Sequence, residues 1–304
     1  MLYLQNEEAR QFHTSNTAVA LGKFDGVHLG HQMLISQMMQ EKRKGRTTLI
    51  FTFGGSPNSV LMGGSKKVIY TSIEKAYYFS KLGVDVLLEY PFTKEFASIS
   101  PEDFVYNCLA KQLGVRAIYV GEDFHFGKGR SGNVGVLKEL SEKYYFEVHD
   151  LQKKTLHGKV VSSTAIRDML ENKFHVANEM LGNPYFVYGE VVHGEHLGNT
   201  IGFPTINQDI PANKLIPAPG VYASRVTIDG IVYRSISNLG MKPTVGNSRH
   251  VGLETYILDY QGNVYGEYVQ TELLFYIRPE EKFKNIDELK RQINDDIQMM
   301  MENV

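Results

Sequence analysis

A short stretch near the amino terminus constrains the fold of this chain more than any other part of it. Apolar residues 19–21 are followed by three glycines spaced four residues apart, with His28 and His31 beside the last of them. An apolar run that stops at a glycine turn and continues into an amphipathic segment indicates a strand, a tight turn and a helix start. Glycines let the backbone approach a ligand, and the N–H groups of a helix start bind anions. The stretch therefore predicts an α/β protein with a phosphate site.

The two histidines suit a phosphate better than a metal. Imidazole hydrogen-bonds phosphate oxygens and, when protonated, neutralises charge that develops during phosphoryl attack. The alternatives are a zinc pair or two ordinary surface histidines. Zinc would need further ligands at recognisable spacing, and the only cysteine, Cys108, lies in an apolar helical pattern. No GxxxxGK[ST] pattern occurs in the chain, so a P-loop is excluded.

Helical and strand patterns alternate from this turn up to residue 120. Apolar residues recur at helical spacing in 32–43 and 72–82, and Ser100 followed by proline and two carboxylates predicts a capped helix to about residue 113. The β-rich runs are 47–53, 84–90 and 115–120. This alternation predicts a doubly wound parallel sheet, which binds ligands at the carboxyl ends of its strands.

Two later segments carry polar side chains after predicted strands. Glycine-rich segment 121–132 combines aromatic and basic residues, which can grip a base or a flavin and its phosphate, although a flexible surface loop has the same composition. In segment 160–167, a predicted strand ends at hydroxyl side chains and a predicted helix starts there. Arg167 lies about one turn into that helix. Helix capping alone explains the hydroxyls. Binding of a triphosphate tail would instead use the hydroxyls, the helix start and Arg167 together.

The pattern changes after residue 183. Short β runs separated by glycine, proline, asparagine and aspartate predict hairpins that close into a small antiparallel barrel, and Asn285 caps a terminal helix over 286–301. Single cores stop growing at roughly 250–300 residues. We therefore expect two domains, 1–183 and 184–304. The predicted β runs of the second are 189–193, 220–228, 231–239, 253–259 and 267–277.

Charge and composition exclude several classes of protein. A net charge of −2 gives no general attraction to nucleic acid or to an anionic membrane. No apolar run reaches about 18 residues, and the amino terminus lacks a signal-peptide pattern. One cysteine fits a reducing compartment. We expect a cytoplasmic protein with small-molecule partners, no nucleic acid or membrane partner, and at most weak or transient self-association.

Four motifs resemble those of the bacterial bifunctional riboflavin kinase/FMN adenylyltransferase family, the FAD synthetases. Residues 22–31 resemble its GxFDGxHxGH motif, residues 121–127 its GxDFxFG segment, and residues 161–167 its ISSTxIR motif. Residues 194–207 resemble the flavokinase GxxxGxxxGFPTxN motif. The motifs lie in the family's order and span nearly the whole chain.

For the first domain, the resemblance implies adenylyl transfer from ATP to FMN, giving FAD and pyrophosphate. His28 and His31 would hold the transferring phosphate, and Ser163, Thr164 and Arg167 would hold the triphosphate tail. The resemblance also implies binding of ATP or flavin by Gly22, Phe24, Asp25, Gly26, Gly30, Asp123, Phe124 and Gly127.

For the second domain, the resemblance implies phosphorylation of riboflavin by ATP, with Mg²⁺ as cofactor. Thr205 and Asn207 would supply oxygen ligands to Mg²⁺, and Glu254 would take the proton from the 5′-hydroxyl. A glycine-rich loop that ends at a fixed Pro-Thr turn would fold over ATP. The nucleotide-binding positions implied in this loop are Gly198, Gly202, Phe203 and Pro204.

Some positions of the second domain depart from the family pattern. Asn199 and Lys242 stand where the family usually has arginine, whose bidentate fork neither residue reproduces, and PTAN is replaced by PTIN. Three alternatives remain open, of which the first follows from Asn199. The chain would be an FMN adenylyltransferase whose barrel only binds flavin or regulates, a nucleotidylyltransferase for another small phosphate, or a flavin-sensing interaction protein.

Overall fold

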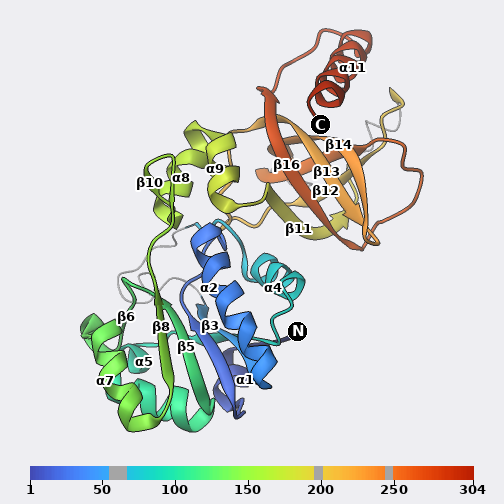
Figure 1. Ribbon diagram of the computed structural model, residues 1–304. Helices are drawn as coiled ribbons and strands as arrows, with labels where there is room; N and C mark the ends of the chain where they lie inside the picture. The colour runs from blue at the N-terminus through green and yellow to red at the C-terminus, as the bar shows by residue number, and fades with distance from the viewer. Residues whose placement is uncertain (55–66, 195–200, 244–248) are drawn as a thin grey trace. The chain divides into compact units, whose positions relative to one another are not determined.

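The computed structural model describes residues 1–54, 67–194, 201–243 and 249–304 and separates the chain into two compact units, Met1–Ser163 and Thr164–Val304 (Figure 1). Each unit has its own sheet and its own buried apolar core, so each is described by itself. The functional boundary that we predict between residues 183 and 184 stays a prediction.

A parallel sheet with the strand order β1-β4-β3-β2-β5-β8 forms the centre of the first unit. The chain builds the sheet on one side of β2 first and on the other side later, so the carboxyl end of β2 lies at a topological switch point. Open α/β sheets bind ligands at such points. The strands are β1 (Leu2–Gln5), β2 (Thr17–Leu21), β3 (Thr47–Gly54), β4 (Val86–Pro91), β5 (Val115–Gly121) and β8 (Glu147–Leu151).

Helical segments cover both faces of this sheet (Figure 1). On one face, Ala9, Leu109 and Leu137, from three different segments, pack with apolar side chains of the strands. On the other face, α2 contacts β2 and β5. This arrangement confirms the predicted α/β fold. The segments are α1 (Asn6–Gln11), α2 (Leu29–Met39), η1 (Gln40–Lys44), α4 (Ser72–Lys81), α5 (Lys94–Ala97), α6 (Pro101–Asp103), η2 (Phe104–Gln112), η3 (Lys128–Arg130) and α7 (Val134–Tyr144).

The elements of this unit follow the predicted alternation with a few differences. Ser100 caps its helix by accepting a hydrogen bond from the Asp103 N–H at 3.0 Å, as expected, and the helix continues as the π-helical segment η2. The strand predicted before Ser162 is only two residues long. It forms one strand of the short antiparallel pair β9 (Thr155–Leu156) and β10 (Lys159–Val160), and a second such pair is β6 (His125–Phe126) with β7 (Gly132–Asn133).

The second unit is built on a closed barrel with the strand order β11-β12-β15-β14-β13-β16. All its pairings are antiparallel, which confirms the predicted barrel. The sequence did not predict β12, because its first residues belong to the GFPT motif that we assigned to a turn. The strands are β11 (Tyr185–Val192), β12 (Thr205–Asp209), β13 (Gly220–Ile228), β14 (Ile231–Pro243), β15 (Arg249–Ile257) and β16 (Tyr268–Arg278).

In the described residues, this part of the chain also contains the helices α8 (Ser163–Asn172), α9 (Phe174–Leu181) and α11 (Ile286–Asn303). The Asn178 amide on α9 donates to two carbonyl oxygens of β16 at 3.0 Å. Asn285 caps α11 as predicted, with Oδ1 accepting from the Glu288 N–H at 2.9 Å. The buried pair of Arg278 and Asp296 then fixes α11 to the end of β16 through three hydrogen bonds of 2.8–3.2 Å.

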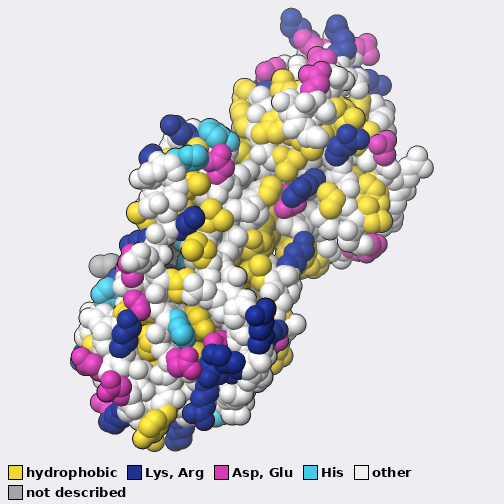
Figure 2. Space-filling model, viewed as in Figure 1, with side chains coloured by type: hydrophobic (Ala, Val, Ile, Leu, Met, Phe, Trp, Pro, Cys, Tyr) yellow, Lys and Arg dark blue, Asp and Glu magenta, His cyan; other side chains and the backbone are white. Residues whose placement is uncertain are grey.

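Figure 2 shows Lys and Arg side chains interspersed with Asp and Glu over the visible surface of each unit. Within the described part of the chain, no helix is long and apolar enough to cross a membrane.

Candidate active sites

The turn after β2 has a strained backbone. Phe24 and Val27 have φ angles of 49° and 39°, and Gly26 has a φ of 82°. Positive φ is a genuine outlier for a β-branched residue such as Val27 and persists only where the surroundings enforce it. An added Cβ at Gly22 would lie 3.2 Å from the Phe24 ring, so a small residue is needed there.

Hydrogen bonds from four separate segments hold this turn in place. Thr52 Oγ1 donates to the carbonyl oxygen of residue 23 at 3.2 Å, and the Ile69 N–H donates to Asp25 Oδ1 at 2.8 Å. Ser163 Oγ donates to the Asp25 carbonyl at 2.9 Å, and Gln32 Nε2 donates to the carbonyl of residue 27 at 2.8 Å. The ISSTxIR serine and the first motif therefore meet within the first unit.

His28 and His31 lie at the amino-terminal end of α2. His28 is the N-cap residue and is 7% exposed. The two rings stack with centroids 3.6 Å apart, and the Phe24 ring lies 5.1 Å from that of His31. An added Cβ at Gly30 would lie 3.4 Å from the His28 ring, in ordinary van der Waals contact with it.

Both imidazoles are neutral at neutral pH in the ligand-free chain. Burial lowers the pKa of His28 to about 4, against the opposing effect of the Asp25 carboxylate. Burial also holds the pKa of His31 well below its usual value, and the charges of His28 and Lys75 act in the same direction. The Nδ1 atom of each ring is buried and has no hydrogen-bond partner in the described part of the chain. An anionic ligand would supply acceptors and favour the protonated forms.

A buried ion pair that the sequence did not reveal lies in the same unit. Lys75 on α4 is 8% exposed, and its Nζ lies 3.6 Å from Oε1 of Glu89, which is 4% exposed. Ser72 and Tyr3 also donate hydrogen bonds to the Glu89 carboxylate. A lysine within an amphipathic helix gives no signal of burial, so only the fold brings this cation near His31.

Aromatic side chains gather at the carboxyl ends of β3 and β4. Phe53 lies 5.1 Å from Phe92 and 5.5 Å from Phe96 between ring centroids, and Tyr90 lies 4.9 Å from Phe96. Phe53, Phe92 and Phe96 remain partly exposed. This cluster was not predicted from the sequence, although aromatic residues near the end of each of the two strands were a usable signal.

Segment 121–132 forms a short hairpin rather than an open loop. The Phe124 ring stacks on the Phe126 ring with centroids 5.6 Å apart. Gly127 has a φ of 69°, and an added Cβ there would lie 2.8 Å from the Pro101 ring, so this position requires glycine. The exposed Asp123 carboxylate pairs with Lys153 Nζ at 2.9 Å.

Two predicted phosphate ligands lie on α8 in the second unit. Thr164 is exposed and Arg167 is half-buried. Their joint action with the histidines of the first unit stays a prediction.

Two side chains of the barrel converge on the carboxylate of Glu254. Thr205 Oγ1 on β12 donates to Glu254 Oε1 at 2.9 Å, and Lys242 Nζ on β14 lies 2.7 Å from Glu254 Oε2. Lys242 reaches Glu254 across Gly252, where an added Cβ would lie 2.8 Å from Lys242 Cγ. The predicted base, the predicted metal-binding hydroxyl and the lysine that replaces the family's arginine therefore meet.

Asn207, the second predicted metal ligand, pairs in register with Glu254 across β12 and β15. An added Cβ at Gly194 would lie 2.7 Å from Asn207 Cγ, so the glycine-rich motif begins against this side chain. Gly202 has a φ of 89°, and the Phe203 ring packs edge-on against Tyr256 with centroids 5.3 Å apart. Gly198 lies outside the described residues.

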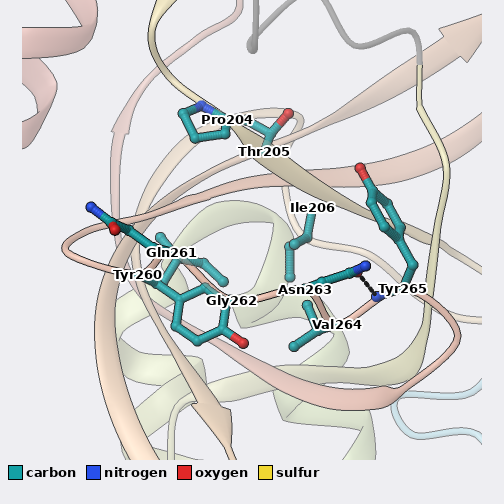
Figure 3. Close-up of a pocket in the computed structure, with 10 residues that line it drawn as sticks. Pro204, Thr205, Ile206, Tyr260, Gln261, Gly262, Asn263, Val264 and Tyr265 are labelled. Atoms are coloured by element: carbon teal, nitrogen blue, oxygen red, sulfur yellow. Dashed lines mark hydrogen bonds between the residues drawn. The ribbon is translucent and has the colours of Figure 1, made fainter.

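A pocket of about 250 Å³ opens beside the GFPT segment (Figure 3). Pro204 and Thr205 line one side of it, and residues 260–265 line the other. The Tyr265 N–H donates to Asn263 Oδ1 at 3.0 Å, which holds the tip of that segment. The walls combine the aromatic residues Tyr260 and Tyr265 with the polar residues Gln261 and Asn263, and they thus suit a flat heterocycle.

The donor set of the barrel fits Mg²⁺ better than zinc. Among the described residues, no group of three or more His, Cys, Asp or Glu side chains could hold a metal. Thr205 and Asn207 offer hydroxyl and amide oxygens, and Mg²⁺ binds through a few such oxygens together with substrate phosphates.

Known proteins resemble both units. A family model described as FAD synthetase matches residues 10–165, and one described as riboflavin kinase matches residues 181–304. The bifunctional riboflavin kinase/FMN adenylyltransferase of Haemophilus influenzae is 35% identical over 92% of each chain. That of Listeria monocytogenes is 38% identical over 93% of this chain and 91% of its own.

A solved structure covers the full length of this chain as well. It is described as a macrolide-efflux protein from Streptococcus pneumoniae, is 28% identical, covers 100% of both chains and superposes with a TM-score of 0.83. Neither family model describes efflux, and both agree with the names of the bacterial relatives. The chain belongs to the bifunctional riboflavin kinase/FMN adenylyltransferase family.

Proposed function

We propose that this chain makes FAD in two steps at two separate sites. The barrel, within residues 184–304, phosphorylates riboflavin with ATP, and the parallel-sheet domain, within residues 1–183, adenylylates the resulting FMN with a second ATP. The observation that carries the proposal is the presence of two sites of different chemistry. One has stacked histidines with unpaired buried nitrogens, and the other has a carboxylate held by a hydroxyl and an ammonium.

In adenylyl transfer, an oxygen of the FMN phosphate attacks the α-phosphorus of ATP. A P–O bond forms, the bond from the α-phosphorus to the bridging oxygen breaks, and pyrophosphate leaves. No covalent nucleophile on the protein is needed, so positioning and charge stabilisation supply the catalysis. His28 and His31 donate to the oxygens of the transferring phosphate, and the proximity of that phosphate raises their protonated fraction. Ser163, Thr164 and Arg167 bind the triphosphate tail.

The strained turn and the aromatic cluster complete this site. Residues 22–26 place their backbone against the phosphates, and the hairpin with Asp123, Phe124 and Gly127 closes over the nucleotide or the flavin. The partly exposed rings of Phe53, Phe92 and Phe96 offer stacking surfaces of the kind that a flavin ring needs.

In riboflavin phosphorylation, the terminal hydroxyl of the ribityl chain attacks the γ-phosphorus of ATP, and ADP leaves. Glu254 accepts the hydroxyl proton, while the Thr205 hydroxyl and the Lys242 ammonium hold its two oxygens in place. Thr205 and Asn207 would hold Mg²⁺, which would shield charge on the transferring and leaving phosphates. The pocket beside Pro204 and Thr205 would take the adenine, with the glycine-rich loop from Gly194 through Gly198 and Gly202 folding over the phosphates.

Replacements at each site separate the two activities. In His28→Ala/His31→Ala, FAD formation from FMN should fall by at least about a hundredfold, as for loss of a transition-state donor pair, with FMN formation unchanged. Glu254→Gln should abolish FMN formation and leave FAD formation from supplied FMN intact. FAD formation surviving within a few-fold in the histidine variant would refute the phosphate assignment. No FMN from the wild type would favour the alternative of a barrel that only binds flavin.

The cellular setting is a further part of this proposal. ATP as co-substrate and a single buried cysteine suit the reducing cytoplasm. The partners would be ATP, riboflavin and FMN, and any self-association would be weak or transient.

A further inference from the structure

A row of side chains runs across the outside of the barrel through the kinase site. Asn207, Glu254 and Asn238 are successive register partners on β12, β15 and β14. Residues directly opposite each other on neighbouring strands point to the same face, with Cβ atoms about 4.5–5.5 Å apart. The family resemblance assigns roles to Asn207 and Glu254, whereas it assigns none to Asn238.

The row faces outward, because its sequence neighbours fill the interior. Leu239, Leu253 and Gln208, each next to one member of the row, are fully buried. Beyond Asn238, the row continues to Val221 on β13, which packs in the apolar cluster that includes Met300 of α11. Asn238 thus lies between Glu254 and the apolar contact beneath α11.

Asn238 carries a buried acceptor that nothing in the described part of the chain satisfies. Its Oδ1 is shielded from solvent and has no hydrogen-bond partner there. The Glu254 carboxylate does not satisfy it, because its oxygens are themselves acceptors, which pair with Thr205 Oγ1 and Lys242 Nζ. A buried unpaired polar group costs about 1–3 kcal/mol, so an asparagine beside an apolar cluster requires an explanation such as a ligand.

The geometry of the site indicates which substrate lies next to Asn238. In the proposed kinase site the nucleotide lies on the β12 side of Glu254, because Thr205, Asn207 and the pocket at residues 204–206 are all there. The acceptor hydroxyl must touch Glu254, and the rest of the acceptor then extends away from β12 toward β14. The part of riboflavin next to its terminal hydroxyl is a chain of secondary hydroxyls, and these are hydrogen-bond donors.

We propose that the Asn238 side chain binds a secondary hydroxyl of the ribityl chain and thereby aligns the terminal hydroxyl with Glu254. This inference rests on the proposed kinase function. It makes Asn238 a residue that selects polyol-bearing acceptors, and it accounts for an amide at a position where leucine would pack.

The test compares Asn238→Leu, Asn238→Ala and the wild type, with Arg234→Ala as the control. Arg234 is exposed on the same strand, outside the site. KM for riboflavin should rise about tenfold or more in both Asn238 variants, as for loss of one buried hydrogen bond, while KM for ATP stays within twofold. Arg234→Ala should match the wild type. Asn238→Leu should melt at or above the wild-type temperature, since it removes an unpaired buried group.

A second flavin substrate tests whether Asn238 contacts the secondary hydroxyls. For a flavin with an unbranched hydroxypentyl chain, which keeps the terminal hydroxyl and lacks the secondary ones, the wild type and the variants should agree within twofold. A riboflavin KM unchanged in both Asn238 variants, a penalty that persists with the hydroxypentyl flavin, or a large loss of melting temperature in Asn238→Leu would overturn the proposal.

Flavin binding separates this inference from the proposed kinase function. Titration of riboflavin by its fluorescence measures Kd without turnover, and the same tenfold difference is expected there. If the wild type formed no FMN, the kinase proposal would fail, while the ratio of Kd values would still decide the role of Asn238.

Discussion

Acidification from pH 7 to pH 5 should destabilise the first unit through its buried histidines. His28 has a pKa of about 4 in the folded chain against about 6.5 when unfolded, so the unfolded state binds the proton more readily between these values. The stability that neutral His28 contributes is fully present above pH 6.5 and is lost as the pH falls toward 4. For these two values the loss from pH 7 to pH 5 is about 2 kcal/mol from His28 alone. His31 shifts in the same direction and adds to it.

Hydrogen exchange of the full-length chain measures this loss for one unit at a time. The free energy of opening of β2, whose residues are all buried, reports the stability of the first unit, and β13 reports that of the barrel. In His28→Gln, which cannot titrate, the decrease between pH 7 and pH 5 at β2 should be about 2 kcal/mol smaller than in the wild type. At β13, the change in opening free energy between pH 7 and pH 5 should be the same for both proteins. An equal decrease at β2 in both proteins would refute the assignment of a neutral, buried His28.

Three substitutions test other contacts. Gly194→Ala should displace the Asn207 side chain and lower riboflavin phosphorylation severalfold, with adenylyl transfer unchanged in the same preparation. Asp296→Asn breaks a buried ion pair with Arg278 and should lower the opening free energy of the barrel, measured by hydrogen exchange, by about 3–5 kcal/mol. An unchanged opening free energy would contradict the role of this pair in fixing α11. Gln112→Ala removes three bonds to carbonyls of the α1 region, so exchange at residues 9–12 should speed up at least about tenfold without loss of activity.

The regular elements near the motifs could be predicted because their patterns are strong. The apolar run before Gly22, the proline after Ser100 and the cap at Asn285 each have a local physical cause, and the structure contains the corresponding strand and caps. Strands β1 and β8 were not predicted. They lie at the two edges of the sheet, where fewer side chains are buried and the hydrophobic pattern is correspondingly weak.

Only those residues of the candidate sites that a motif or the family resemblance identifies could be predicted from the sequence. His28, Ser163 and Thr205 stand in motifs, whereas the role of Glu254 rests on the family resemblance alone. The structure adds the contacts of Ser163, Thr205 and Glu254. Lys75 could not be found in the same way, because its burial depends on packing between α4 and the sheet. The role of Asn238 depends on strand register, which a sequence without its barrel does not specify.

The central claim is that one chain holds two activities at two sites, and a product assay tests it most directly. Purified protein is incubated with ATP and Mg²⁺ and either riboflavin or FMN, and the flavins are separated by chromatography. We predict FMN and then FAD from riboflavin, FAD from FMN, and loss of only the second step in His28→Ala/His31→Ala. FAD from FMN but no product from riboflavin would contradict the kinase assignment. Absence of FAD in both reactions would contradict the account as a whole.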